Sequence, residues 1–392
     1  MLIEFTEEQL MLQKTIRNFA EKEVAPIAEE IDRHETFPMK NFKKLGELGV
    51  LGITVPPEYG GAGSGYVEMG IVCEELSRVC LSTGASYAAH ADLCVDNLRR
   101  NGSERQNKKY LPGLCSGEKI GGLAMTEPSA GSDVLSMRLR ADKNDNHYVL
   151  NGSKTFITNG PVGDIFVVYA KTDMEKGPLG VTAFIIEKGF PGFSAGKKFE
   201  KMGWRGSPTG ELIFDNCHVP KENVLGHVGG GANVLMSGLN TERIIIGATC
   251  IGLSQGALEL ALKYSKERVQ FGKPISSFQL IQGKLADMAM EVEISRIITY
   301  YALKYSDNVI HGPAIKDDRA LMSKMNLLAS YVKLYTSEVS IRVTNEALQI
   351  LGGYGYIREF PAERMVRDAR LMTIGGGTSE IQRLIIAREI LR

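Results

Sequence analysis

The apolar residues of this 392-residue chain change their spacing twice along the sequence, which limits the folds that it can adopt. Up to about residue 120, they recur at helical spacing in segments separated by glycine and proline. From about 121 to 230 they gather in short β-branched and aromatic runs. The helical spacing then returns and continues to the C-terminus. The order helix, sheet, helix predicts the segregated layers of an α+β fold rather than a doubly wound sheet.

Three domains are predicted from this pattern: an N-terminal α-helical domain over residues 1–120, a middle antiparallel β domain over 121–230 and a C-terminal helical bundle over 231–392. Asn-Gly, Gly-Pro and Asp-Asn turns bound the middle runs, as is typical of antiparallel strands. The last domain has enough long helical segments for a four-helix bundle, around residues 240–268, 276–306, 319–350 and 378–391. Because 43% of the residues are hydrophobic, intrinsic disorder is not expected.

The charge balance argues against several functions. Lys plus Arg is 46 and Asp plus Glu is 46, so no net positive field can hold a nucleic acid, and nucleic-acid binding is not expected. The first residues lack the basic and apolar regions of a signal peptide. Polar and charged residues interrupt the most apolar stretch, which begins at Glu242, so no stable membrane insertion is expected.

The cysteines and histidines indicate neither disulfides nor a metal. Six cysteines without a C-x-x-C pattern are typical of buried thiols in a reducing compartment. Six histidines form no zinc-binding spacing, so no metal site is expected. The chain also lacks a G-x-S-x-G elbow and a P-loop lysine, which disfavours hydrolase and nucleotide-triphosphatase functions.

Two local features could carry chemistry. The loop from Leu123 to Asp133 places hydroxyls, small residues and a proline at the mouth of the β domain, where they can surround a phosphate or a planar ring. A plain surface turn is the alternative. Glu242 and Arg243 lie at the head of a helix that is apolar almost all round. Neighbouring positions on a helix do not face each other, so Glu242 is either paired structurally elsewhere or catalytic.

A third feature is the glycine run from Gly375 to Gly377, ahead of the last helix. Ser379 and Gln382 match the S-x-x-Q capping box that opens a helix. Small residues before a helix N-terminus suit an anion or the polar edge of a ligand, and an ordinary helix cap is the alternative. Because three glycines carry no side chain, any acting group must come from elsewhere.

Taken in order, several long segments resemble the acyl-CoA dehydrogenase family: AMTEPSAGSD, NGSKTFITNG, ERVQFGKPISSFQLIQGKLADMAM, QILGGYGY, MVRDAR and GTSEIQRLIIARE. Within that family, SYAAHADLCVDNLRRNG and LMSGLNTER are most similar to the isovaleryl-CoA dehydrogenase branch. The resemblance covers nearly the whole chain. It implies FAD bound between the β domain and the C-terminal bundle, an acyl-CoA substrate, and a homotetramer in which a neighbouring subunit completes the flavin site.

The resemblance also implies which residues bind the ligands. It places the flavin ring against Leu123, Met125, Thr126, Phe156 and Thr158, with Ser132 near the pyrophosphate and the acyl-CoA. It implies that the neighbouring subunit supplies the residues that contact the adenosine half of FAD, which are Arg268, Phe271, Gln279, Gln349, Gly352 and Gly353. Thr378, Ser379 and Glu380 are expected at the cofactor, and Asn240, Arg243, Gly376 and Gly377 at the substrate. Phe156 stands where the family usually has tryptophan, which keeps a stacking surface without the indole N–H.

The resemblance implies that Gly376 stands where most of the family has its catalytic glutamate. In the isovaleryl branch the base comes instead from the position of Glu242, so we expect Glu242 to take the α-proton of the thioester. The backbone N–H of Gly376 can still donate to the thioester oxygen. We also expect the glycine to leave volume beside Cα and Cβ, which suits a branched or cyclic acyl group.

Asp92 stands where the isovaleryl branch has asparagine, in the segment implied to line the acyl end of the pocket. A solvated helix charge is the favoured interpretation. The alternative is a second base that acts on a ring substrate.

The function predicted from the sequence is FAD-dependent α,β-dehydrogenation of a short branched or cyclic acyl-CoA, with electrons passing to an electron-transferring flavoprotein. The isovaleryl, isobutyryl, 2-methylbutyryl and cyclohexane- or cyclohexene-carboxyl thioesters are not distinguished. The alternatives are a cyclic acyl-CoA dehydrogenase that uses Asp92 as base, and an oxygen-using oxidase of the same fold. The expected location is the bacterial cytoplasm, or the mitochondrial matrix for a mature eukaryotic chain.

Overall fold

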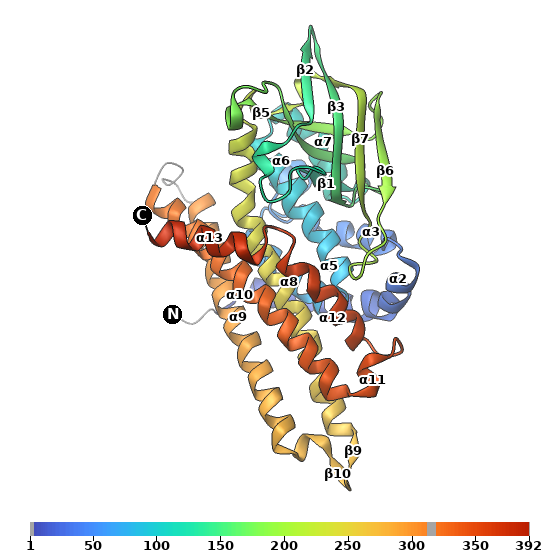
Figure 1. Ribbon diagram of the computed structural model, residues 1–392. Helices are drawn as coiled ribbons and strands as arrows, with labels where there is room; N and C mark the ends of the chain where they lie inside the picture. Colours follow the sequence, from blue (N-terminus) through green and yellow to red (C-terminus); the bar gives the residue numbers. More distant parts are fainter. Residues whose placement is uncertain (1–3, 312–318, 392) are drawn as a thin grey trace.

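The computed structural model describes residues 4–311 and 319–391 and confirms the predicted helix, sheet, helix order. The sheet forms one end of the molecule, long C-terminal helices extend away from it, and the N-terminal helices pack against both (Figure 1).

The N-terminal part consists of short helices: α1 (Glu7–Phe19), α2 (Ala28–His34), α3 (Met39–Glu47), α4 (Tyr66–Val79), α5 (Leu81–Ala88), α6 (Asn97–Asn101) and α7 (Glu104–Cys115). Capping boxes begin two of them, since Thr6 and Gln9 satisfy each other's backbone N–H groups at α1, and Ser103 and Gln106 do so at α7. Between α5 and α6 the chain forms a π-helix, η4 (Ala89–Asp96), which carries Asp92. Segments of π-helix occur frequently at functional sites.

The sheet contains β1 (Gly121–Ala124), β2 (Arg140–Asn144), β3 (His147–Thr158), β4 (Ile165–Lys171), β5 (Val181–Glu187), β6 (Phe193–Lys198), β7 (Thr209–Pro220) and β8 (Val224–Leu225). Its order is β6-β7-β3-β2-β4-β5-β8, with β1 beside β4. Most pairings are antiparallel as predicted, but β1 and β2 each run parallel to β4, so the sheet is mixed. Asn151-Gly152 is not a turn between strands as expected, because it lies inside β3 at a register shift where Gly152 has φ +139°.

The predicted four long C-terminal helices are α8 (Gly231–Glu267), α9 (Gln279–His311), α10 (Arg319–Leu351) and α13 (Ser379–Ile390). Two shorter helices, α11 (Gly353–Tyr356) and α12 (Ala362–Arg370), lie between α10 and α13, and a hairpin of β9 (Val269–Gln270) and β10 (Lys273–Pro274) joins α8 to α9.

Helix α8 begins at Gly231 rather than near residue 240. A Cβ at Gly231 would lie 2.7 Å from the backbone carbon of Thr182, so only glycine allows this close approach to β5. By length and composition α8 could cross a membrane, but 78% of its most apolar window is buried inside the protein, as in a core helix.

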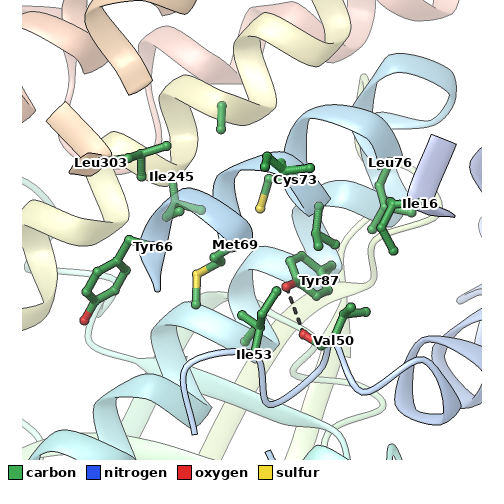
Figure 2. Packing of buried hydrophobic residues seen from close by; sticks show 14 of the residues in the cluster. Ile16, Val50, Ile53, Tyr66, Met69, Cys73, Leu76, Tyr87, Ile245 and Leu303 are labelled. Atoms are coloured by element: carbon green, nitrogen blue, oxygen red, sulfur yellow. Dashed lines mark hydrogen bonds between the residues drawn. The ribbon is translucent and has the colours of Figure 1, made fainter. Parts of the chain in front are cut away.

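The burial of α8 follows from packing on two sides. Figure 2 shows Tyr66, Met69 and Cys73 of α4 packing near Ile245 of α8, whereas Leu76 of α4 lies beside Ile16 of α1. The N-terminal helices therefore cover one side of α8 while α9 and α10 cover another. A carboxylate at Glu242 lies in the middle of this arrangement.

Candidate active site

Glu242 is a buried carboxylate whose charge is not fully compensated. Its side chain lies on α8 and is 8% exposed, and its Oε2 atom has no hydrogen-bond partner within the described part of the chain. Burial raises the pKa of the Glu242 carboxyl to about 7, although Arg243 and Lys333 oppose the rise. A buried acid with an unpaired oxygen and a pKa near neutrality has the properties of a general base.

Gly376 lies beside this carboxylate. A Cβ built on Gly376 would be 3.8 Å from Glu242 Oε1. The residue has φ +64°, which favours glycine. Its backbone N–H has no acceptor among the described residues, whereas its carbonyl oxygen accepts from Gln382 Nε2 at 3.3 Å. The glycine loop therefore brings an unpaired N–H donor close to the unpaired carboxylate.

Ile246 corrects one expectation about Gly376. The same Cβ would lie 2.3 Å from Ile246 Cδ1, so this side chain, one turn after Glu242 on α8, already fills the space on that side of the glycine. The glycine does not leave an empty volume there. Ile246 therefore lies against the Gly376 loop, a contact that the sequence did not indicate.

The expected capping box at the last helix is wrong. The N-cap of α13 is Thr378, whose side chain accepts from the backbone N–H of Ile381 at 3.3 Å. Ser379 is instead the first helical residue, and its buried Oγ atom has no partner in the described chain. Gln382 turns back and donates to the carbonyls of Gly376 and Gly377. The Gln382 amide thus fixes the glycine loop. Glu380, also expected at the cofactor, is exposed in the first turn of α13.

The interpretation of Asp92 as a solvated charge is also wrong. Asp92 is 3% exposed, and its Oδ1 atom has no hydrogen-bond partner in the described chain. Burial raises the pKa of its carboxyl well above the usual range, and the negative charges of Asp96 and Glu242 raise it further. Asp96, on the same π-helix, is instead held by the guanidinium groups of Arg99 and Arg100. Asp92 is therefore a second buried acid close to Glu242.

Arg243 and Asn240 lie beside the base without neutralising it. Arg243 Nη1 donates to Asn240 Oδ1 at 3.4 Å, and its Nε atom has no partner among the described residues. Asn240 Nδ2 donates to Asn326 Oδ1 at 2.6 Å. The described chain contains no ion pair between Glu242 and Arg243, in line with their adjacent helical positions.

Lys333 on α10 was missed by the sequence. Its side chain is fully buried, its Nζ atom has no partner within the described residues, and burial lowers the pKa of its ammonium group to about 8. Its charge opposes the rise in the pKa of Glu242. A helical-period count could have found it, since Lys333 falls among the buried positions Ala329, Thr336 and Ser340 of the same helix.

The residues expected around the flavin ring meet at the end of β1. The backbone N–H of Thr155 donates to the carbonyl of Thr126 at 2.9 Å, which joins the loop after β1 to β3. Phe156 has φ +58° and is 66% exposed, and its ring lies 5.3 Å from that of Phe199. A large aromatic side chain turned outward at a strand irregularity offers a face for a planar ring. These residues fit an isoalloxazine.

The other residues expected there lie near this face or on the loop. Leu123 is buried on β1 opposite Val167, Thr158 pairs with Thr209 at the end of β3, Met125 is half-buried, and Ser132 is exposed at the loop tip.

The residues assigned to the adenosine half lie elsewhere in the same chain. A cavity of about 570 Å³ is lined by Arg268, Gly352, Gly353 and Tyr354, and the Arg268 guanidinium lies 5.5 Å from the centre of the Tyr354 ring. Phe271 is 92% exposed. Gln279 and Gln349 are also exposed. Arg268 follows Glu242 by 26 helical positions, roughly 39 Å along α8, so it cannot reach the Glu242 site of its own chain.

Comparison with known proteins gives matches along the whole chain. Three domain models of the acyl-CoA dehydrogenase family match: the N-terminal domain over residues 6–118, the middle domain over 122–217 and the C-terminal domain over 229–391. The mitochondrial isovaleryl-CoA dehydrogenase of Solanum tuberosum is 48% identical over 390 residues, which cover 99% of this chain and 92% of that protein.

Solved structures agree with this result. The butyryl-CoA dehydrogenase of Megasphaera elsdenii superposes with a TM-score of 0.94 at 39% identity, covering all of both chains. An acyl-CoA dehydrogenase of Bacillus anthracis, solved in complex with FAD, has a TM-score of 0.93 at 38% identity and covers 99% of this chain and 67% of that one.

Proposed function

The chain belongs to the acyl-CoA dehydrogenase family, and on that premise we propose that it forms the 2,3-enoyl thioester of a short branched or cyclic acyl-CoA, with Glu242 as the base. It is an oxidoreductase that acts on acyl-CoA and uses FAD. The observation that carries the proposed base is the unpaired carboxylate of Glu242 beside the loop at Gly376. The proposed substrate class rests on the similarity to isovaleryl-CoA dehydrogenase.

Bound FAD supplies the acceptor for the hydride that leaves Cβ of the substrate. Glu242 takes the proton from Cα as this hydride leaves. Burial strengthens the carboxylate as a base by raising its pKa to about 7, and a substantial fraction stays ionised at neutral pH. The positive charges of Arg243 and Lys333 keep the pKa from rising further.

Negative charge builds on the thioester oxygen as the proton leaves. The unpaired backbone N–H of Gly376 can donate to this oxygen without a side chain. Donors held in place in this way typically contribute roughly 3–4 kcal/mol to transition-state stabilisation. In this proposal the glycine loop stabilises charge and Glu242 moves the proton.

We propose a homotetramer in which a neighbouring subunit completes the FAD site. Two observations support it. The cavity lined by Arg268, Gly352 and Gly353 lies too far from Glu242 for these residues to contact a ligand at the Glu242 site of the same chain. In addition, α9 exposes large apolar side chains at a spacing of three and four residues, which suits burial against another helix: Met290, Ile294, Ile297 and Tyr301.

The electron acceptor and location are proposed from the family resemblance. An electron-transferring flavoprotein is the proposed acceptor, and the bacterial cytoplasm or mitochondrial matrix the proposed location. All six cysteines are free and buried, which suits a reducing compartment. The alternative is a relative that passes electrons to oxygen. Peroxide formation in air without an added acceptor would support that oxidase and contradict the proposed acceptor.

A second candidate function rests on Asp92. Its burial and its unpaired oxygen favour a further proton transfer on a cyclic acyl or enoyl-CoA, such as a cyclohexane-carboxyl thioester. Asp92→Asn keeps the shape of the side chain and removes the carboxyl group that could transfer a proton. A loss of turnover that is limited to ring substrates would support a role of Asp92 as a base. Full activity of this variant on every thioester would contradict that role.

Bleaching of the flavin absorbance without oxygen tests the substrate class. The panel contains isovaleryl, isobutyryl, 2-methylbutyryl, cyclohexane-carboxyl and straight-chain C4 to C16 thioesters. We expect fast bleaching by one or more branched or cyclic members. A strong preference for long straight chains would contradict the proposed class, and bleaching by no thioester would contradict the proposed function itself.

A further inference from the structure

Two buried charges lie beneath the loop from Met125 to Leu139, which joins β1 to β2, outside the Glu242 site. Lys154 on β3 is fully buried, and Glu127 in the loop is 5% exposed. Lys154 Nζ lies 2.8 Å from Glu127 Oε1. The loop carries Thr126 and Ser132, which are expected at the flavin and the acyl-CoA, while Lys154 and Glu127 themselves point into the protein.

The pair ties three separate points of the chain together. Lys154 Nζ also donates to the carbonyl of Met125 at 3.0 Å. The Glu127 carboxylate accepts the backbone N–H of Arg138 at 2.6 Å and that of Leu139 at 2.9 Å. The beginning of the loop, its end and strand β3 therefore meet at one hydrogen-bonded pair.

The tip of this loop has few other supports. Glu127 and Ala130 exchange backbone hydrogen bonds at 3.0 and 3.1 Å, and the residues at 128, 129 and 131–133 are exposed. The register of β3 against β7 shifts between Lys154 and Ile157, which turns Phe156 outward while Lys154 stays inside. One short piece of β3 thus holds the loop from below and offers the aromatic face beside it.

Stability alone does not explain a buried ion pair. Removing two charges from water costs about as much as their attraction returns, and apolar replacements of similar volume are often as stable. A fully hydrogen-bonded pair does, however, favour one loop arrangement over others. An arrangement fixed before binding lowers the entropy cost of binding a ligand.

We propose that Lys154 and Glu127 are positioning residues, which hold the loop in the shape that receives the flavin and the acyl-CoA without touching either. The inference rests on the proposed ligand contacts of Thr126 and Ser132. Loss of the pair should weaken FAD binding and make the loop more mobile. An apolar pair of similar size should restore the stability of the fold but not the fixed arrangement of the loop or the FAD affinity.

The test uses three variants of the full-length protein: Glu127→Gln, Lys154→Met and the double variant Glu127→Leu/Lys154→Met. The readouts are the FAD dissociation constant, the hydrogen exchange of the Arg138 and Leu139 amides, and the melting temperature. We expect FAD binding at least about 10-fold weaker and exchange at least about 100-fold faster in all three. The double variant should recover the melting temperature lost in Lys154→Met.

Two controls separate positioning from general destabilisation. Val219→Ala opens a cavity at the far end of the same sheet, so it should lower the melting temperature and leave FAD binding unchanged. Arg140→Met removes an exposed ion pair with Asp142 and should change neither quantity.

Wild-type FAD affinity in the double variant, or unchanged exchange of the two amides in Glu127→Gln, would overturn the proposal. If a single variant fails to fold, the FAD affinity of the double variant tests the proposal instead. None of these readouts requires turnover, so a wild-type protein that oxidises no acyl-CoA would contradict the proposed function and leave this test intact.

Discussion

The carboxyl group of Glu242 combines burial with an unpaired oxygen, and both properties shape its acid–base behaviour. Because the proposed base must be ionised to take a proton, we expect kcat/KM to rise with pH through about 7 and to level off above it. Lys333→Met removes a positive charge that favours the ionised form, so the midpoint should move to higher pH. Stopped-flow flavin reduction between pH 5.5 and 9 measures both profiles. Identical midpoints in the two proteins would argue against this electrostatic role.

The same carboxyl should lower the stability of the protein at alkaline pH. Its pKa rises from 4.5 in the unfolded chain to about 7 in the folded one, so folding loses stability as pH rises through this window. Glu242→Gln removes the loss and should raise the free energy of unfolding at pH 8 by roughly 2–3 kcal/mol. Urea unfolding at pH 5 and pH 8 measures it. An equal effect of the substitution at both pH values would contradict the account.

Sequence reasoning selected Glu242 and Gly376, and the structure brings them together. The acid was visible because it enters an apolar helix, and the glycine run because it precedes a helix. The burial of Asp92 was not visible, since it depends on β1 and α8, which pack against the π-helix from distant parts of the chain. The space filled by Ile246 and the buried Lys333 likewise depend on how α8 meets α10 and the glycine loop.

His90 joins three elements near the site. The backbone N–H of Gly121 on β1 donates to His90 Nδ1 at 2.9 Å, so the proton lies on Nε2, which donates to the carbonyl of Leu114 on α7 at 3.1 Å. Burial lowers the pKa of this imidazole to about 4. The neutral ring therefore links the π-helix that carries Asp92 to α7 and to β1, the strand that leads into the loop from Met125 to Leu139.

This link predicts a loss of stability in mild acid. The unfolded chain takes up a proton on this histidine below about pH 6.5, whereas the folded chain does so only near pH 4, so stability falls as pH decreases through that window. The fall should be roughly 2 kcal/mol between pH 6.5 and 5. Urea unfolding should show a smaller fall for His90→Gln than for wild type, whereas exposed His34→Gln should behave as wild type. Equal falls in all three proteins would contradict this.

At the scale of the elements, the type of each long element was predictable from the sequence, whereas the residues at which it begins and ends were less so. Local periodicity depends on residues close in sequence, so the long helices α8, α9, α10 and α13 were predictable. The parallel pairing of β1 with β4 depends on residues far apart in sequence, and no local pattern reports it. Gly152 is a turn signal by composition, but the two neighbouring strands hold it inside β3 as an irregularity.

The whole molecule carries the Glu242 site and the Arg268 cavity at separate places. We expect Ile294→Glu/Ile297→Glu on α9 to break the proposed tetramer, because it places charges in an exposed apolar surface that would be buried between subunits. FAD binding should weaken with it, since we propose that Arg268, Gly352 and Gly353 bind the FAD of the neighbouring subunit. Mass photometry and FAD titration measure the two effects. Exposed Leu10→Glu on α1 is the control, and a monomeric variant with undiminished FAD affinity would contradict the shared site.

The most direct measurement of the central claim is the rate of flavin bleaching in Glu242→Gln without oxygen, at a saturating concentration of the best thioester. With FAD still bound, we expect a rate at least about 100-fold below wild type, because the general base is lost. Glu267→Gln, at the exposed end of the same helix, should bleach at the wild-type rate. A Glu242→Gln protein that bleaches as fast as wild type would show that Glu242 is not the base.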